Sequence, residues 1–228
     1  MNWRKYVPRF AKRTLRSTMN AAESMVAVPQ KSRDELHDYW KEPYDGSNQP
    51  EDYIALENPR RSEYLVKIVR EHVPADAGIL EIGCNVGRNL NYLHTAGFTN
   101  LSGIEISENA IRLLKASFPD LARRLTIYNR PVEEVIPTIA DRQFDFVFTM
   151  AVLEHIHRDS EGVFKEIARV ASKYLFTFED EGCQSWRHFP RNYKKIFEPF
   201  GWKQVHEEAG EAVIGIGGGF VARLFVRG

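Results

Sequence analysis

The chain is poor in the features that mark secreted and membrane proteins. It holds two cysteines in 228 residues, Cys84 and Cys183, which are too few for a disulfide framework and lack the spacing of a zinc motif. No apolar stretch approaches the roughly 20 residues that cross a bilayer, and the N-terminus has no apolar secretory signal. We therefore expect a cytoplasmic protein in a reducing environment.

An excess of charge of either sign is also missing. The sequence has 31 Lys and Arg against 31 Asp and Glu, so no overall positive field would attract nucleic acid, which is not expected as a partner. A length of 228 residues suits one α/β domain with an N-terminal extension and leaves no room for a second substrate domain.

The most informative stretch is apolar and ends in a glycine turn. Ile79 to Ile82 predict a buried strand, Gly83 and Gly87 follow it, and the residues up to Ala96 predict a helix. Glycine lets a ligand approach the main chain, and the free N–H groups of a helix start favour an anion or carboxylate. A tight turn without a ligand would carry the same glycines.

A second apolar run, Leu101 to Glu105, ends in an acidic residue about 20 positions after the glycine turn. In a βαβ unit, a carboxylate at this place accepts hydrogen bonds from ribose hydroxyls. The two strand ends together therefore predict a site for a cofactor that contains adenosine. The third glycine of a dinucleotide fingerprint is absent, which argues against a nicotinamide-dependent oxidoreductase.

The glycine turn resembles the first motif of the class I S-adenosylmethionine-dependent methyltransferases. That motif reads acidic-x-Gly-x-x-x-Gly and is matched by Glu81, Gly83 and Gly87. Asn85 stands where the family usually has a further glycine, and asparagine tolerates left-handed backbone better than most residues. Downstream, residues 144–156 resemble the family's fourth strand and the loop after it, so several motifs follow in order.

The resemblance covers the chain from about Glu63 to Gly228. It implies a Rossmann-like α/β fold, with a seven-stranded, mostly parallel sheet, helices on both faces and an antiparallel C-terminal hairpin strand. It also implies S-adenosyl-L-methionine as the cofactor and S-adenosyl-L-homocysteine as the product. The cofactor-binding residues inferred from the matching positions are Glu81, Gly83, Cys84, Asn85, Gly87, Asn89, Glu105, Ile106, Val132, Glu133, Met150 and Ala151.

Alternating hydrophobic patterns support a parallel sheet with helices on both faces. The first helix would have Asn58 as its N-cap and Pro59 as its first residue. The glycine-rich residues 215–219 would form the last connection or a mobile active-site loop. Helices are predicted over 59–73, 87–96, 109–118, 161–171 and 193–200, and strands over 79–82, 101–105, 125–128, 144–149, 174–178, 203–207 and 220–226.

Residues 1–58 precede the domain, which we assign to residues 59–228. Six basic residues come before the first acid, Glu23, with aromatic residues among them. They predict either an ordinary terminal arm or a helix on a membrane surface, and Pro8 weakens the second interpretation. Residues 32–58 are rich in aromatic residues, and the resemblance implies a lid over the active site there, with plain packing as the alternative.

Two groups of residues predict the substrate side. His155 follows the fourth strand and is the candidate general base, because its ordinary pKa lies near neutrality; helix capping or packing is the alternative. Residues 179–193 follow the fifth strand, where open α/β sheets bind ligands, although a solvated loop would look similar. The candidate substrate-binding residues are Tyr39, Trp40, Tyr44, Glu179, Trp186, Arg187, His188 and Arg191.

The predicted function is in-line transfer of a methyl group to oxygen or nitrogen of a small polar molecule. A catalytically silent cofactor-binding partner or regulatory module is the alternative. No metal is expected at Glu179 to Glu181, because consecutive side chains of a strand point in different directions. The sequence leaves the acceptor and the oligomeric state open.

Overall fold

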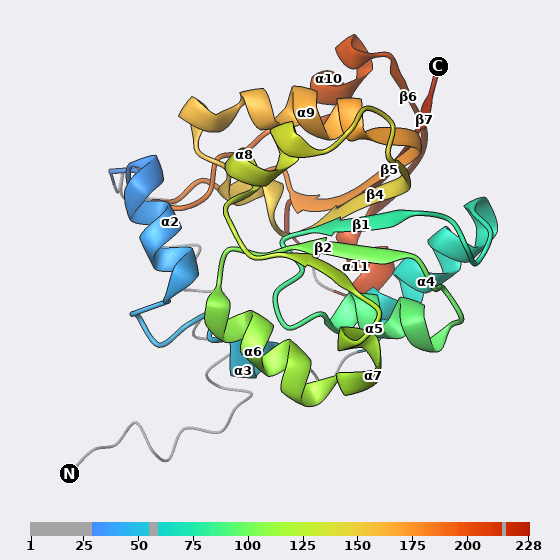
Figure 1. Ribbon diagram of the computed structural model, residues 1–228. Helices are drawn as coiled ribbons and strands as arrows, with labels where there is room; N and C mark the ends of the chain where they lie inside the picture. Colours follow the sequence, from blue (N-terminus) through green and yellow to red (C-terminus); the bar gives the residue numbers. More distant parts are fainter. Residues whose placement is uncertain (1–28, 55–58, 216–217) are drawn as a thin grey trace.

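The computed structural model describes residues 29–54, 59–215 and 218–228. Over these residues the chain forms a three-layer α/β domain, with helices on both faces of a central sheet (Figure 1). The basic residues of the expected terminal arm lie outside this range, and so does Asn58. No helix within the range is long and apolar enough to cross a bilayer.

Seven strands form one sheet in the spatial order β3-β2-β1-β4-β5-β7-β6. The first five pair in parallel, and β7 inserts antiparallel between β5 and β6. The expected mostly parallel sheet with an antiparallel C-terminal hairpin is thus confirmed. The strands are β1 (Ile79–Ile82), β2 (Leu101–Ile104), β3 (Thr126–Tyr128), β4 (Phe144–Met150), β5 (Ala171–Asp180), β6 (Trp202–Ala209) and β7 (Phe220–Arg227).

The centre of the sheet is where its strand order reverses. β1 pairs with β2 on one side and with β4 on the other, so Ile82 lies between Ile104 and Thr149. The chain therefore leaves β1 and β4 toward opposite directions along the sheet. A crevice opens beyond the carboxyl ends of strands at such a switch point, and ligands of open α/β sheets bind there.

Two apolar layers hold the helices against the sheet. On one face α8, α9 and α10 pack over side chains such as Leu80 and Val147. On the other face α4, α5 and α11 pack over Ile79 and Phe146. The helices are α2 (Arg33–Lys41), α3 (Pro50–Ile54), α4 (Arg60–His72), α5 (Arg88–Thr95), α6 (Glu108–Ser117), α7 (Pro119–Ala122), α8 (Val132–Val135), α9 (Gly162–Val170), α10 (Tyr193–Phe197) and α11 (Gly210–Ile214).

Most helix boundaries lie within two residues of the prediction, and the differences have physical reasons. Pro59 is the N-cap of α4 and not its first residue. β5 runs to ten residues because antiparallel pairing with β7 extends it to Asp180, which a parallel neighbour alone would not do. Between the strands expected over 203–207 and 220–226, residues 210–214 form the short helix α11, which was not predicted and whose left-handed C-cap is Gly215.

Helix α2 was not predicted, although its start carries a clear signal. Ser32 caps it, because the Ser32 hydroxyl accepts from the backbone N–H of Glu35 while the Glu35 carboxylate accepts from the Ser32 backbone. This is a capping box. The many aromatic residues of the segment suggested a lid, so its helical pattern was not recognised. Leu36 and Tyr39 are the buried positions of that helix.

Candidate functional site

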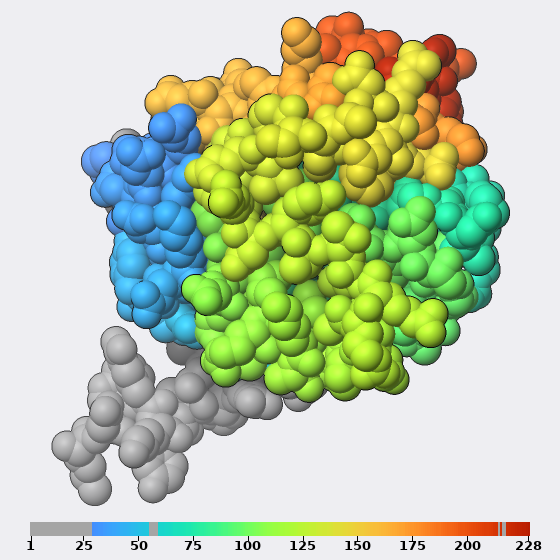
Figure 2. Space-filling model, viewed as in Figure 1, coloured from blue at the N-terminus to red at the C-terminus, as the bar shows by residue number. Residues whose placement is uncertain are grey.

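A pocket of about 480 Å³ opens where the carboxyl ends of β1, β2 and β4 meet. Helix α2 and the segment after it lie beside the domain body and supply one wall of the pocket (Figures 1 and 2). This segment contacts the body through side chains: His37 Nε2 lies 3.1 Å from Glu133 Oε1, and Ser107 Oγ donates to the Lys41 carbonyl at 3.1 Å. The pocket therefore has a floor made by the sheet and a wall made by residues 33–53.

The turn after β1 is shaped by three residues with positive φ. Gly83 and Gly87 have φ of 70° and 71°, and Asn85 has φ of 47°, so the asparagine adopts the left-handed backbone expected for it. A Cβ on Gly83 would lie 2.5 Å from Val152 Cγ2, and one on Gly87 would lie 2.5 Å from Leu114 Cδ1. Glycine is thus required here by packing of the turn against neighbouring loops and helices as well as by its backbone angles.

Glu81 is a buried carboxylate at the end of β1 that faces the pocket. Asn89 Nδ2 donates to its Oε1 at 2.8 Å, and Ser62 Oγ donates to Asn89 Oδ1 at 2.8 Å, which fixes the amide. No hydrogen-bond partner among the described residues reaches Glu81 Oε2. Burial raises the pKa of Glu81 to about 8, and the bond from Asn89 opposes that rise only in part. An unpaired buried oxygen of this kind is suited to a cationic ligand.

Glu105 follows β2 and holds two backbone N–H groups. Its Oε2 accepts from Asn85 at 2.7 Å, and its Oε1 accepts from Ser107 at 2.8 Å. Burial raises the pKa of this carboxyl, and the backbone bonds oppose the rise. Each carboxylate oxygen keeps a further lone pair, so Glu105 joins the β1 turn to the start of α6 and still offers acceptors to hydroxyl groups in the pocket.

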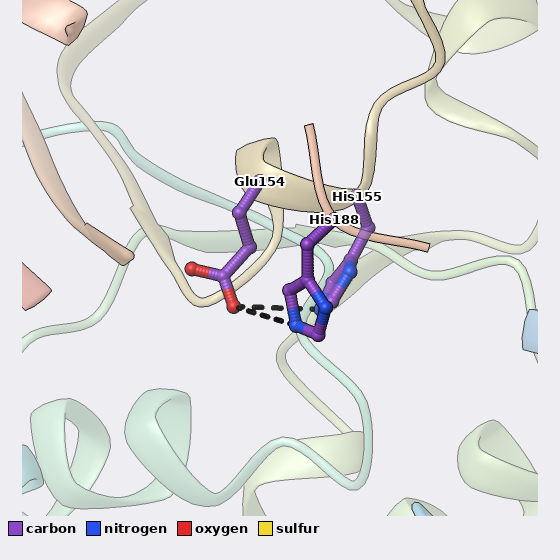
Figure 3. A group of neighbouring side chains, drawn as sticks. All are labelled: Glu154, His155 and His188. Carbon is purple, nitrogen blue, oxygen red and sulfur yellow. Dashed lines mark ion pairs between the residues drawn. The ribbon is translucent and has the colours of Figure 1, made fainter. Parts of the chain in front are cut away.

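The opposite end of the pocket contains two imidazoles and a buried carboxyl group. The Nε2 atoms of His155 and His188 lie 3.5 and 3.8 Å from Glu154 Oε1 (Figure 3). The Trp40 ring packs on the His155 ring at a centroid distance of 4.5 Å. Burial lowers the pKa of His155 well below its ordinary value, with His188 adding to the effect, and burial also lowers the pKa of His188, to about 4. Both imidazoles are therefore neutral at physiological pH.

A clamp of two carboxyl groups fixes the loop after β4. Glu179 Oε2 accepts from the backbone N–H of Val152 at 2.8 Å and of Glu154 at 3.3 Å, while Glu154 Oε2 accepts from the backbone N–H of Asp180. Burial raises the pKa of Glu179 to about 7, and burial together with the nearby Glu179 raises the pKa of Glu154 well above its ordinary value. These hydrogen bonds join the loop after β4 to the end of β5, and residues of that loop form part of the pocket wall.

The structure places most of the sequence-derived site residues around this one pocket. Gly87 is the exception among the cofactor candidates, since it caps α5 behind the turn. The candidates that line the pocket are Glu81, Gly83, Cys84, Asn85, Asn89, Glu105, Ile106, Val132, Glu133, Met150, Ala151 and His155, with Trp40, Arg187 and His188 from the substrate group.

Five substrate candidates lie outside the pocket lining: Tyr39, Tyr44, Glu179, Trp186 and Arg191. Tyr39 is buried, and its ring packs edge-on against Trp186 at 5.0 Å. Arg191 is buried and donates to the carbonyls of Leu153 and Phe189 and to Glu161, so its guanidinium is committed inside the protein. A direct role in binding for these five residues stays a prediction.

Several lining residues were not among the sequence-derived candidates. Arg61 and Arg88 come from the starts of α4 and α5, and the Arg61 guanidinium lies 5.3 Å from the centre of the Phe178 ring. Glu154 was read only as part of the fourth-strand motif. Its position beside His155 was a signal, because a carboxylate and an imidazole in sequence at a strand end are both ligand-forming groups.

Three comparisons relate the chain to known proteins. A family model described as a methyltransferase domain matches residues 80–174. A curated protein of Rickettsia bellii, a ubiquinone biosynthesis O-methyltransferase, is 25% identical over 118 residues, covering 51% of this chain and 48% of its own length. The chain therefore spans about half the length of the curated relatives it matches.

Solved structures resemble the chain over most of its length. A Burkholderia thailandensis 1,6-didemethyltoxoflavin N1-methyltransferase aligns with a TM-score of 0.67 at 14% identity, covering 89% of this chain and 93% of that one. Magnesium protoporphyrin IX methyltransferase from Synechocystis PCC 6803 aligns with a TM-score of 0.66 at 15% identity, covering 89% and 100%. At this level of identity the likeness describes the fold.

Proposed function

We propose that the chain is a class I S-adenosylmethionine-dependent methyltransferase, and that it transfers a methyl group from S-adenosyl-L-methionine to oxygen or nitrogen of a small polar acceptor. One observation carries the proposal. Acidic residues at the ends of β1 and β2 and a neutral histidine after β4 line the same pocket. The cofactor would occupy the end near β1 and β2, and the acceptor would occupy the end near His155.

The residues at the β1 and β2 end fit S-adenosyl-L-methionine chemically. Its ammonium group would supply the cation that the unpaired Glu81 Oε2 lacks. Its ribose hydroxyls would donate to the remaining lone pairs of Glu105. Ile106, Val132 and Glu133 lie on the pocket wall next to Glu105, where we place the adenine. When bound, the cofactor supplies a methyl group on a positively charged sulfur, which is an electrophile.

The protein's part in the reaction is to bind, orient and exclude water. Met150 and Ala151 end β4 between the two halves of the pocket, and Ala151 has a positive φ of 59°. That backbone is fixed, because the Ala151 N–H donates to Phe178 O at 2.8 Å and Glu179 holds the next residue. A wall held in this way keeps acceptor and methyl group in line, which supplies much of the rate enhancement of a displacement at carbon.

His155 is the group that we propose for removal of the acceptor proton. Its Nδ1 bonds to the Arg187 carbonyl at 2.9 Å, and because a carbonyl only accepts, Nδ1 carries the proton. The lone pair of the neutral ring is then on Nε2, which lies 3.5 Å from Glu154 Oε1 in the pocket lining (Figure 3). A neutral imidazole with an oriented lone pair is the form that a general base requires.

We propose residues 29–54 as a lid over the acceptor. Gln30 Nε2 donates to His188 O at 3.2 Å, and the Lys31 backbone N–H donates to Trp186 O at 3.1 Å. The lid is thereby tied to the same segment that carries His188. With Trp40 against His155, it would shield the reacting groups from water.

Binding and turnover test the proposal separately. Titration calorimetry with S-adenosyl-L-homocysteine should show one site per chain, and the ligand should raise the melting temperature. A panel of small acids, phenols and amines should then be screened for release of S-adenosyl-L-homocysteine from S-adenosyl-L-methionine. Absence of binding at millimolar ligand would contradict the proposal, while binding without turnover on a broad panel would favour the silent binding module.

A further inference from the structure

We propose that Glu154, His155 and His188 bind one divalent ion of the first transition row, with Zn²⁺ as the best geometric match. The three residues come from the loop after β4 and from the segment after β5, and all three line the acceptor end of the pocket. The role that we give the ion rests on the proposed function, whereas the binding of the ion does not.

The geometry is that of three ligand atoms around one point. Figure 3 shows both imidazoles directed toward the same carboxylate oxygen, with distances to Glu154 Oε1 of 3.5 Å for His155 and 3.8 Å for His188. The three ligand atoms all lie within 4.8 Å of one another. Tetrahedral zinc with bonds of about 2.1 Å places its ligand atoms about 3.4 Å apart, so only small side-chain movements would close the site.

The hydrogen bonds of the two imidazoles leave their Nε2 atoms for a ligand. His155 donates through Nδ1 to the Arg187 carbonyl, as argued above, so its Nε2 has a lone pair and no proton. His188 Nδ1 lies 2.6 Å from Ser185 Oγ, which likewise engages the nitrogen that faces away from Glu154. Histidines that bind metals use one ring nitrogen for the ion and the other for such an outer bond.

The carboxyl group is held in the same manner. Glu154 Oε2 accepts from the backbone N–H of Asp180, so the carboxyl is oriented, and Oε1 is the oxygen that faces the two imidazoles. The lone pair on His155 Nε2 therefore faces Glu154 Oε1 at 3.5 Å, an oxygen that repels it as a carboxylate and can donate to it only as the protonated acid. Two acceptors directed at one another repel unless a cation or a shared proton lies between them.

The composition of the site selects the ion. Two imidazoles and one carboxylate suit zinc and its neighbours better than Mg²⁺ or Ca²⁺, which prefer oxygen ligands. Three protein ligands leave a fourth position open, which is the pattern of catalytic zinc sites. Since the ligands line the acceptor end, that fourth position would face the acceptor.

Such an ion would change how the acceptor loses its proton. With Nε2 of His155 bound to the ion, an acceptor hydroxyl in the fourth position has a lowered pKa and releases its proton to solvent. The oxygen lone pair then attacks the methyl carbon, and the electrons of the breaking carbon–sulfur bond stay on sulfur. The acceptors favoured would be phenols, enols and hydroxy acids.

The test uses the full chain, freed of metal by dialysis against a chelator. Titration calorimetry with Zn²⁺ should give one ion per chain, and Co²⁺ should produce the intense visible absorption of a tetrahedral site. His188→Ala removes a direct ligand, so it should weaken Zn²⁺ binding at least as much as loss of an outer partner does, about 10- to 100-fold. His94→Ala removes a histidine of α5 outside the cluster and should leave Zn²⁺ affinity unchanged.

S-adenosyl-L-homocysteine affinity is measured on the same samples, because it reports the proposed function without the ion. Wild-type affinity for S-adenosyl-L-homocysteine together with no Zn²⁺ or Co²⁺ binding at about 100 µM would overturn the metal site alone. Zn²⁺ binding that is equal in wild type and His188→Ala would overturn it as well. Loss of S-adenosyl-L-homocysteine binding in the wild-type chain would instead contradict the proposed function.

Discussion

The two ends of the pocket are built in different ways. The end near β1 and β2 comes mainly from one continuous stretch, residues 79–107, with Val132 and Glu133 added from α8, and two backbone N–H groups bind to Glu105 there. The end near His155 is assembled from three segments far apart in sequence: Trp40, Glu154 with His155, and Arg187 with His188. The contacts that join these three segments include side-chain pairs such as Trp40 with His155 and His188 with Glu154.

This difference suggests which end of the pocket can vary in sequence and which cannot. Backbone geometry fixed by a βαβ unit tolerates little change, so the cofactor end can be conserved as one piece of local structure. Side chains brought together from separate loops can be exchanged one at a time, so the acceptor end is where specificity can vary. The predictions below test that division.

The largest effect is expected at Gly83. Gly83→Val places a side chain against Val152, because a Cβ there lies 2.5 Å from Val152 Cγ2, and it also strains a φ of +70°. We expect affinity for S-adenosyl-L-homocysteine to fall more than about 100-fold by calorimetry. Gly97→Val is the matched control, since Gly97 has φ of +99° with nothing within 4 Å, so it carries the backbone strain alone.

The Gly97 variant should be less stable to heat but should bind S-adenosyl-L-homocysteine normally. If Gly83→Val does not fold, Gly83→Ala gives the same comparison with a smaller side chain. Equal affinity in the Gly83 and Gly97 variants would show that the turn does not shape the cofactor end.

Glu105→Ala should weaken S-adenosyl-L-homocysteine binding by about 1–3 kcal/mol, because ribose hydroxyls and two backbone N–H groups lose their acceptor. Calorimetry measures the change, and thermal unfolding separates it from loss of fold. Glu108→Ala, an acidic position in the first turn of α6, should change the affinity little. Similar losses in both variants would point to a general charge effect and not to a ribose contact.

Trp40→Ala tests the acceptor end. Removing the ring from His155 should raise the acceptor KM by about two- to tenfold, since a packed aromatic contact contributes about 0.5–1.5 kcal/mol. Affinity for S-adenosyl-L-homocysteine should stay within about twofold, because the cofactor end is untouched. Phe200→Ala removes a ring that is 38% exposed and lies outside the pocket lining, so it should leave both constants close to wild type. A large loss of S-adenosyl-L-homocysteine affinity in Trp40→Ala would show that the two ends of the pocket are not independent.

The smallest effect is a pH dependence from Glu81, whose pKa is about 8 in the free protein. A bound ammonium group lowers that pKa, so binding releases a proton below pH 8 and affinity rises with pH before levelling off. From pH 7 to pH 8 the rise should be about fivefold. Calorimetry in buffers with different ionisation enthalpies detects the proton, and Glu81→Gln should remove both the proton release and the pH dependence.

The fold was largely predictable because its signals are local. Apolar runs of the strand type, broken by glycine turns, located β1 and β2, and helical spacing located α4, where Leu65, Ile68 and Val69 are buried. Secondary-structure propensity could not show that β7 inserts between β5 and β6. The antiparallel C-terminal strand was expected only because of the family resemblance. Helix α2 was missed although Ser32 and Glu35 form a capping box.

The candidate site was also predictable only where its residues come from one local segment. Glu81, Asn85 and Glu105 follow from strand ends and spacing along one segment. The approach of His188 to Glu154 depends on how the loops after β4 and β5 fold over one another, and no local pattern contains that distance. Glu179 shows the same limit, because its carboxylate serves backbone N–H groups inside the protein and not the pocket lining.

The attachment of residues 29–54 has a consequence for how this fold could diversify. Within that segment no residue pairs with a strand of the sheet, and its ties to the body are a few side-chain and loop contacts. A segment joined in this way can be replaced without rebuilding the core. Replacing Arg33 to Tyr53 with a different stretch would change one wall of the pocket and leave the turn after β1 and Glu105 as they are. If the proposed function holds, such a replacement would alter acceptor choice without altering cofactor binding.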